Sequence, residues 1–404
     1  MKTPSNIFLL YLARGVRGFG DGFAIIILPA YLSVLGYDPF QIGVIATASL
    51  LGTALLTLAI GAIAPRYDLR SLLLAGACLM AGTGLAFPNV EQFAFIALVA
   101  FVGTVNPATG DLGVLVPIEH AMLSHDVADQ DRTRIFARYS LIGALSMAAG
   151  ALAAAVPDFL VLTGIGKVGA FKLMFYAYAA LGALSAMLYR RLPHAHMDQP
   201  RASAPLGPSR GVVYKLAALF SLDAFAGGFV VQSLLALWLF ERFELSLSAA
   251  SVFFFWSSVA SAFSYPVAAR LAARIGLINT MVFTHIPSSI LLVIAAFTPN
   301  LYVTLGLLLV RSALSQMDVP TRTSYVMAVV TPPERAAAAS FTAVPRSLAS
   351  GISPAFAGVL LTTAFPALPL VVCGVLKIVY DVALLFSFRH VKPPEEQVRS
   401  ESRK

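Results

Sequence analysis

Residues 40–64 read FQIGVIATASLLGTALLTLAIGAIA, 25 consecutive residues without a charged side chain. A helix rises about 1.5 Å per residue, so this stretch can cross a hydrocarbon core of roughly 30 Å. Eleven further stretches of similar character occur in the 404 residues. We therefore predict an all-α membrane protein with twelve transmembrane helices. The predicted spans cover residues 6–33, 40–64, 70–88, 92–123, 134–156, 168–190, 213–240, 248–272, 277–297, 300–328, 337–363 and 367–389.

The composition excludes a water-soluble globule. Hydrophobic residues make up 58% of the chain and charged residues only 12%, with a mean hydropathy of +0.81. A soluble domain carries about 25% charged residues, so too little polar surface remains here to cover a globule. The two cysteines, Cys78 and Cys373, both lie inside apolar runs. We therefore expect neither a disulfide framework nor a metal site.

The basic residues predict the orientation, because cytoplasmic loops carry an excess of Lys and Arg. With a cytoplasmic N-terminus, eighteen of the 28 Lys and Arg residues fall in cytoplasmic segments and three fall outside. Both termini are therefore expected in the cytoplasm, and the pI near 9.6 is explained without nucleic acid as a partner. The polar stretch 191–211 predicts a cytoplasmic linker between six-helix bundles at 1–190 and 212–390, followed by a cytoplasmic tail at 391–404.

An internal repeat relates the two predicted halves. Residues 117–119 and 131–132 have counterparts at 320–322 and 334–335, each displaced by 203 positions. Two more pairs of similar segments are displaced by 206 and 208 positions: 20–23 with 226–229, and 61–66 with 269–274. Because six spans return the chain to the same side of the membrane, these displacements predict two six-helix repeats of one orientation.

These features resemble the major facilitator superfamily across nearly the whole chain. The family's signature after its second helix is roughly G-x-x-x-D-R-x-G-R-[RK], and Gly61, Arg66 and Arg70 match it. Pro65 stands in place of the acidic residue, and Asp68 stands in place of the second glycine.

Two acidic–arginine pairs add to the resemblance. Asp131–Arg132 and Glu334–Arg335 resemble the pairs that follow helices 4 and 10 of the family. The resemblance implies a fold of two six-helix repeats that works by alternating access. It also implies a central cavity lined by helices 1, 4, 7 and 10, and these helices hold most of the buried charge of this chain.

The first predicted span carries Arg14, Arg17 and Asp21 on one helical face, at spacings of three and four. An ionisable side chain at mid-bilayer costs at least about 2.5–3.5 kcal/mol on insertion scales, so it needs a function or a partner. Asp21 is our first candidate for proton coupling, and Arg17 is a candidate for substrate binding. The alternative is a fixed Asp21–Arg17 ion pair that only neutralises itself.

The other cavity helices supply further candidates. Asp223 is the second candidate for proton coupling, unless it pairs with an arginine of the first helix. Asp111 and Arg311 are candidates for substrate binding, because both lie near the middle of their spans. Gln232 and Trp238 are weaker candidates for the same role.

Two residues of opposite charge, Glu119 and Arg322, occupy equivalent positions in the two halves. We therefore predict a salt bridge between the halves that closes the cytoplasmic gate. Asp318 lies on the same helical face as Arg322 and belongs to this gate group.

The ionisable residues of the peripheral helices have simpler interpretations. Lys377 and Asp381, four residues apart, are expected to neutralise each other. His285 is expected to be a satisfied polar residue rather than a proton relay.

The remaining motifs bear on the energy source. There is no P-loop and no H-E-x-x-H element, so we expect neither an ATP-driven pump nor an enzyme. The sequence predicts a monomeric, proton-coupled transporter of a small organic solute in the bacterial inner membrane, driven by the proton gradient without a cofactor. Export is favoured because many bacterial relatives of this size export, and uptake of a metabolite or organic anion is the alternative. A membrane receptor or lipid-handling protein is the alternative of another class.

Overall fold

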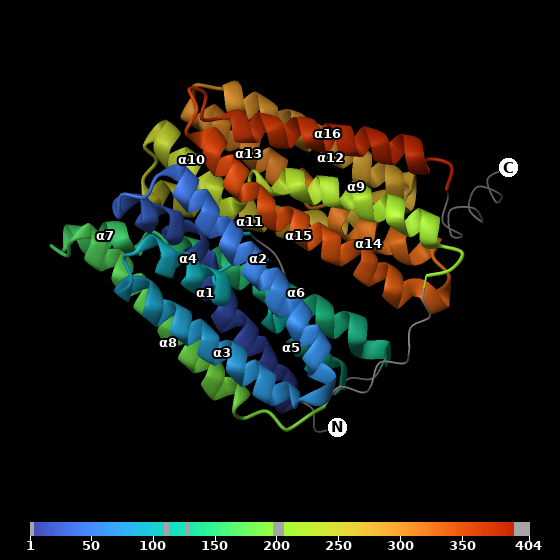
Figure 1. Ribbon diagram of the computed structural model, residues 1–404, viewed down its shortest axis with the longest axis horizontal. Helices are drawn as coiled ribbons and strands as arrows, with labels where there is room; N and C mark the ends of the chain where they lie inside the picture. The colour runs from blue at the N-terminus through green and yellow to red at the C-terminus, as the bar shows by residue number, and fades with distance from the viewer. Residues whose placement is uncertain (1–3, 109–112, 126–128, 197–205, 392–404) are drawn as a thin grey trace. The chain divides into compact units, whose positions relative to one another are not determined.

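Figure 1 shows the computed structural model, which describes residues 4–108, 113–125, 129–196 and 206–391. All the regular secondary structure within these ranges is helical, which confirms the predicted all-α fold. The chain divides into two compact units, which we describe separately. Unit 1 comprises residues 1–200, 231–258 and 354–366, and unit 2 comprises residues 201–230, 259–353 and 367–404.

Unit 1 is built around the long helix α1. This helix packs against α6 and α8, while α3 packs against α8 and α2 packs against α4. Leu73, Tyr139 and Tyr189 are among the fully buried residues of its core. The helices of unit 1 are α1 (Pro4–Val34), α2 (Pro39–Ile63), α3 (Leu69–Ala86), α4 (Phe93–Val102), α5 (Leu115–His125), α6 (Asp129–Ala153), α7 (Val156–Leu162), α8 (Lys167–Tyr189) and α10 (Gln232–Phe243), with the 3-10 turns η1 (Ala64–Arg66) and η2 (Phe87–Asn89).

Unit 2 is organised around α12 and α16. These two helices pack against each other, α9 packs against α16, and α13 packs against α12. Phe220, Tyr325 and Tyr380 are buried in its core. The helices of unit 2 are α9 (Arg210–Gly228), α12 (Leu277–Phe297), α13 (Leu301–Ser315), α14 (Asp318–Val329) and α16 (Leu368–Phe388), with the turn η3 (Pro332–Glu334). Two helices contribute residues to both units, α11 (Leu247–Ile275) and α15 (Arg335–Leu361).

Local capping signals define where several helices begin. The Asp38 carboxylate accepts a hydrogen bond from the Gln41 N–H at 2.8 Å, and the Gln41 side chain accepts one from the Asp38 N–H at 3.1 Å. This capping box, with Pro39 at the first helical position, starts α2. Asp68 and Asn300 cap α3 and α13 in a similar way, each accepting bonds from backbone N–H groups of the first turn.

Ten spans in the described residues are long and apolar enough to cross a membrane. They match ten of the twelve predicted spans within a few residues, except that the fifth continues through α7. Two predicted spans, 92–123 and 300–328, are not among these ten. The internal repeat places these two spans at equivalent positions in the halves.

Span 92–123 is divided into α4 and α5, and Gly103 and Pro107 lie in the interruption. Helix α4 ends at Val102, followed by the capping residue Gly103 with an extended backbone, and α5 begins only at Leu115. Pro107, between them, has no N–H to donate to a helix.

Span 300–328 is divided between Ser315 and Asp318. Helix α13 ends at Ser315, followed by the capping residue Gln316, and α14 begins at Asp318. Pro320 lies in the first turn of α14, where its missing N–H is tolerated. The predicted span 213–240 is likewise divided, into α9 and α10, by residues 229–231.

Candidate functional site

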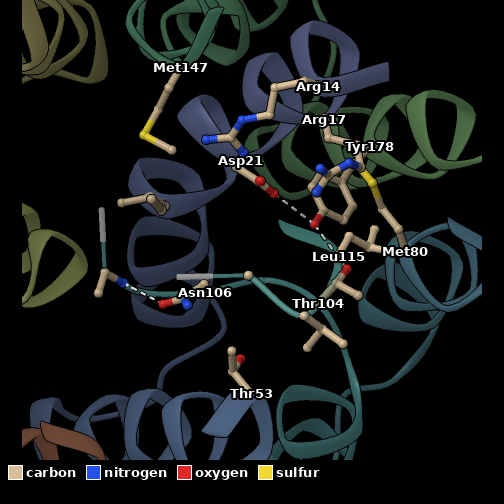
Figure 2. A pocket seen from close by; sticks show the side chains of 14 residues that line it. Arg14, Arg17, Asp21, Thr53, Met80, Thr104, Asn106, Leu115, Met147 and Tyr178 are labelled. Atoms are coloured by element: carbon tan, nitrogen blue, oxygen red, sulfur yellow. Dashed lines mark hydrogen bonds between the residues drawn. The ribbon is translucent and has the colours of Figure 1, made fainter. Parts of the chain in front are cut away.

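The charged face of α1 lines a pocket in unit 1 (Figure 2). Its empty space, including the part open to solvent, is about 560 Å³. Helix α1 contributes Arg14, Arg17, Asp21 and Ile25. The three charged residues, whose spacing in the sequence predicted one helical face, therefore line the same pocket. The other polar lining residues are Thr53 on α2, Thr104 and Asn106 after α4, and Tyr178 on α8, while Met80 and Met147 add apolar surface.

Within the described residues, the carboxylate of Asp21 is hydrogen-bonded to a neutral group. The Tyr178 hydroxyl donates a hydrogen bond to Asp21 Oδ1 at 3.1 Å (Figure 2). The same hydroxyl lies 3.1 Å from Thr104 Oγ1, so Tyr178 connects the carboxylate to the chain after α4. Within the described residues, no cation lies within ion-pair distance of Asp21.

Arg17 forms an ion pair with a carboxylate other than that of Asp21. Its guanidinium forms an ion pair with Glu119 on α5, and its Nε donates to the Tyr189 hydroxyl at 2.9 Å. Glu119 also accepts hydrogen bonds from Tyr139 and, at 2.6 Å, from Tyr189. The alternative interpretation of a fixed Asp21–Arg17 ion pair is therefore wrong. The pair does not form because Arg17 binds Glu119 instead, a residue 102 positions away in the sequence.

The divided span 92–123 leaves backbone groups that side chains and neighbouring helices satisfy. The Val105 carbonyl accepts a hydrogen bond from the Ser49 hydroxyl, and the Pro107 carbonyl accepts one from the Ser233 N–H of α10 at 3.2 Å. Asn106 accepts a bond from the Ala108 N–H at 2.9 Å, an Asx-type turn. Non-helical backbone at membrane depth is tolerated where it lines a cavity or is buried in protein.

Unit 2 contains a second group of buried charges. Asp223 on α9 accepts hydrogen bonds from Lys377 at 2.6 Å and from Arg322 at 3.1 Å. Arg322 also pairs with Asp318 at 2.9 Å, one turn away on α14. Within unit 2, Asp223 therefore pairs with two cations.

The expected Lys377–Asp381 pair is not formed, and that prediction is wrong. Lys377 turns to Asp223 on α9, and Asp381 turns to His285 on α12, with Nδ1 3.0 Å from Oδ1. Although the two side chains share a face of α16, each has a closer partner on a neighbouring helix. The prediction that His285 is a satisfied polar residue agrees with its two ring contacts.

The predicted salt bridge between Glu119 and Arg322 joins residues of different units and stays a prediction. Each residue has an ion pair inside its own unit, with Arg17 and with Asp223 and Asp318, respectively.

Several further candidates are not among the residues that line the unit 1 pocket. Arg311 lies on α13 of unit 2, and Gln232 is the first residue of α10. Trp238 on α10 is fully buried, and its Nε1 has no hydrogen-bond partner among the described residues. Asp111 lies outside the described residues.

The loop after α2 is organised by Asp68, one of the two residues that depart from the family signature. Its carboxylate accepts bonds from Ser71 and from the Ala195 N–H at 2.9 Å, and it lies 3.0 Å from His194 Nδ1. Partial burial acts to raise the pKa of Asp68, but these hydrogen bonds outweigh it and hold the pKa below its usual value. Arg70 lies 3.2 Å from the other ring nitrogen of His194. Gly61 lies near the end of α2, and Arg66 ends η1.

The second acidic–arginine pair joins two segments of unit 2. Glu334 accepts bonds from Ser209 at 2.6 Å, from Thr331 and from the Gly207 N–H. The hydrogen bonds from Ser209, Thr331 and Gly207 lower the pKa of Glu334 to about 2. Arg335 donates to the Met327 carbonyl at 3.1 Å. Asp131 and Arg132 lie in the first turns of α6, and their side chains are outside the described part of the structure.

Sequence reasoning missed the neutral members of the site. Tyr178, Thr104 and Thr53 resemble ordinary residues of transmembrane helices, and their spacing relates them to no charged residue. Asn106 could have been found, because Asn-Pro within a predicted span is a turn signal.

Comparison with known proteins assigns the family. The model of the Major Facilitator Superfamily matches residues 10–231 and again residues 216–404. The uncharacterized membrane protein YJR124C of Saccharomyces cerevisiae is 22% identical over 421 residues, covering 95% of this chain and 94% of the yeast protein. The nucleoside transporter NupG has a similar structure, with a TM-score of 0.74 at 15% identity over 96% of this chain and 100% of its own. The inward-open xylose transporter XylE from E. coli also has a TM-score of 0.74, at 13% identity over 96% and 97% of the chains. The chain is therefore a multi-pass membrane protein that belongs to the Major Facilitator Superfamily and has the fold of its transporters.

Proposed function

We propose that this protein is a proton-coupled secondary transporter of a small polar organic solute, with the unit 1 pocket as its binding site and Asp21 as its proton carrier. The observation that supports this proposal is the set of partners of Asp21. Its carboxylate is bonded to the neutral Tyr178 hydroxyl, while Arg17 is paired with Glu119. A carboxylate that is bonded to no cation can take up a proton without breaking an ion pair.

The lining of the pocket supports a solute that is polar and small. Arg14 and Asp21 offer charges of both signs, and Asn106 and Thr53 offer neutral donors and acceptors. Met80 lies beside these polar groups and offers an adaptable apolar surface. This mixture suits a zwitterionic or hydroxylated organic molecule. The nucleoside and xylose transporters with the same fold carry polar solutes, which is consistent with that class.

The remaining parts of the proposal carry over from the sequence. We propose that the protein acts as a monomer in the cell inner membrane, and that it exports its solute in exchange for protons. Alternating access around the pocket would let Asp21 take a proton on one side and release it on the other while the solute moves in the opposite direction.

The test is proton flux in proteoliposomes that contain a pH-sensitive dye. A panel of zwitterionic, sugar-like and nucleoside-like compounds is added to wild-type protein and to the D21N variant. We expect at least one compound to cause proton movement in the wild type and a loss of at least tenfold in D21N. The sign of the flux separates exchange from co-transport.

The matched control is E91Q, which makes the same chemical change at an exposed carboxylate that pairs with Lys172. This variant should transport as the wild type does. If solute movement in D21N is unchanged and independent of the pH gradient, Asp21 is not the proton carrier.

A further inference from the structure

Unit 2 contains six ionisable side chains in contact with one another that the proposed transport site does not use. They lie on four helices, and none is more than 12% exposed. The group, which we call the unit 2 cluster, consists of Asp223 on α9, His285 on α12, Asp318 and Arg322 on α14, and Lys377 and Asp381 on α16. A cluster of this kind inside a membrane protein needs a physical reason, because burying each charge is costly.

The two ring nitrogens of His285 have partners of opposite charge. Nδ1 lies 3.0 and 3.1 Å from the carboxylate oxygens of Asp381, and Nε2 lies 3.2 Å from the Lys377 ammonium. An ammonium group has only donors, so Nε2 must accept this hydrogen bond. The ring is therefore neutral in this arrangement, and its single proton lies on Nδ1 and is donated to Asp381.

A second arrangement is available to the same side chains. The Asp223 carboxylate oxygen that accepts from Lys377 lies 3.8 Å from His285 Nε2. If Nε2 carried a proton, it would repel the Lys377 ammonium and would need an acceptor. Asp223 is that acceptor, and it keeps its bond from Arg322 at 3.1 Å in either case.

The charges in contact favour the uptake of one proton. With a neutral His285, the cluster contains three carboxylates against the cations of Arg322 and Lys377, a net charge of −1. A charged His285 makes the contacting set neutral. The other titratable or charged side chains that face the cluster are Arg311 on α13, Arg346 on α15, and Cys373 and Tyr380 on α16. The two arginines form no ion pair with the described residues, so they act at longer range.

We propose that His285 is a second proton-binding site, and that its protonation replaces Lys377 by His285 as a partner of Asp223. The proton enters and leaves at Nε2, and no covalent bond other than N–H forms or breaks. Lys377 also lies against the last turn of α9, since its Nζ is 3.7 Å from the position of a Cβ added to Gly227. If Lys377 leaves Asp223, its contact with the last turn of α9 changes as well, next to the interruption at residues 229–231. This proposal is independent of the role of Asp21.

The test is nitrogen NMR of the full-length protein, labelled with ¹⁵N-histidine in lipid nanodiscs and titrated from pH 9 to pH 5. The chain has six histidines, and the signals lost in H285Q identify His285. We expect these signals to show a neutral ring protonated on Nδ1 at high pH and a doubly protonated ring at low pH. In K377M, which removes the like charge at Nε2, the doubly protonated fraction at pH 7 should be at least threefold larger than in the wild type.

Exposed His194 provides the control, because its signals, assigned with H194Q, should be the same in the wild type and in K377M at every pH. The proposal is overturned if the His285 signals keep one protonation state across the whole pH range in both proteins. It is also overturned if they titrate identically in both. Because the measurement does not involve transport, a negative result leaves the proposal for Asp21 unaffected.

Discussion

Arg17 and Glu119 form a buried ion pair whose carboxylate also binds two tyrosine hydroxyls. In the E119Q variant the guanidinium would remain buried without a counter-ion. Removing one partner of a buried pair costs about 3–5 kcal/mol. We therefore expect E119Q to unfold at a clearly lower temperature than the wild type, as measured by thermal unfolding in one detergent.

The exposed Lys172–Glu91 pair gives the matched control for this prediction. Its N–O distance is 3.2 Å, but the Glu91 side chain is 70% exposed. Surface pairs contribute about 0–1 kcal/mol, so E91Q should hardly change the unfolding temperature. Equal effects of E119Q and E91Q would show that the buried pair has no special role in stability.

The sequence predicted which side chains share a helical face better than it predicted which side chains pair with each other. Residue spacing placed Arg17 and Asp21 on one helical face, and both line one pocket. It did not reveal that Arg17 pairs with Glu119, because that contact joins residues 102 positions apart. For the same reason Lys377 was assigned to Asp381, its neighbour on the helix, when it bonds to Asp223 on another helix.

The contact between α1 and α6 is close enough to exclude side chains. A Cβ added to Gly22 would lie 2.1 Å from the Met147 carbonyl oxygen, and one added to Gly150 would lie 2.0 Å from the Phe19 carbonyl oxygen. We expect G22A to push the helices apart and to lower the free energy of unfolding by about 1–3 kcal/mol. Transport should fall too, because Met147 lines the pocket. Both effects are measured by denaturant unfolding and by the proteoliposome assay.

Gly82 on α3 provides the control for this prediction, since nothing lies within 4 Å of an added Cβ. In a helix interior, alanine is more favourable than glycine by roughly 0.5–1 kcal/mol, so G82A should be neutral or stabilising. A G22A protein as stable as G82A would contradict the close contact.

Glu334 connects the segment before α9 to the turn before α15, and its bonds make this connection sensitive to pH. The pKa is lowered from 4.5 to about 2 in the folded protein, so the folded state binds fewer protons than the unfolded one. Its stabilising contribution is complete above about pH 4.5 and is lost as the pH falls towards 2. We expect the unfolding temperature of E334Q to decrease less than that of the wild type between pH 5.5 and 3. Parallel decreases in the two proteins would contradict this assignment.

Hydropathy located the helices but not their interruptions. Span 92–123 contains a long apolar stretch, and Gly103 and Pro107 mark where the helix within it is interrupted. Whether such residues end a helix depends on side chains from elsewhere, such as Ser49 and Thr83, that satisfy the freed backbone groups. Those partners are known only once the helices are packed.

For the whole molecule, the internal repeat is the feature that the sequence predicted most directly. Two overlapping matches of one family model, at residues 10–231 and 216–404, agree with the displacement of about 203–208 positions between similar segments. The repeat relates the halves to each other but does not state which side of the membrane they face. The orientation depends on the distribution of Lys and Arg alone.

That orientation can be tested with two single cysteines placed in a C78S background, in which the remaining Cys373 is buried. Thr163, in the exposed turn between α7 and α8, is predicted to face outside, and Arg191, after α8, is predicted to face the cytoplasm. A membrane-impermeant maleimide should label T163C in intact cells, and it should label R191C only after lysis. The C78S protein should stay unlabelled in both conditions. Labelling of R191C but not T163C in intact cells would reverse the orientation and place both termini outside, because α8 ends on the side where the first repeat began.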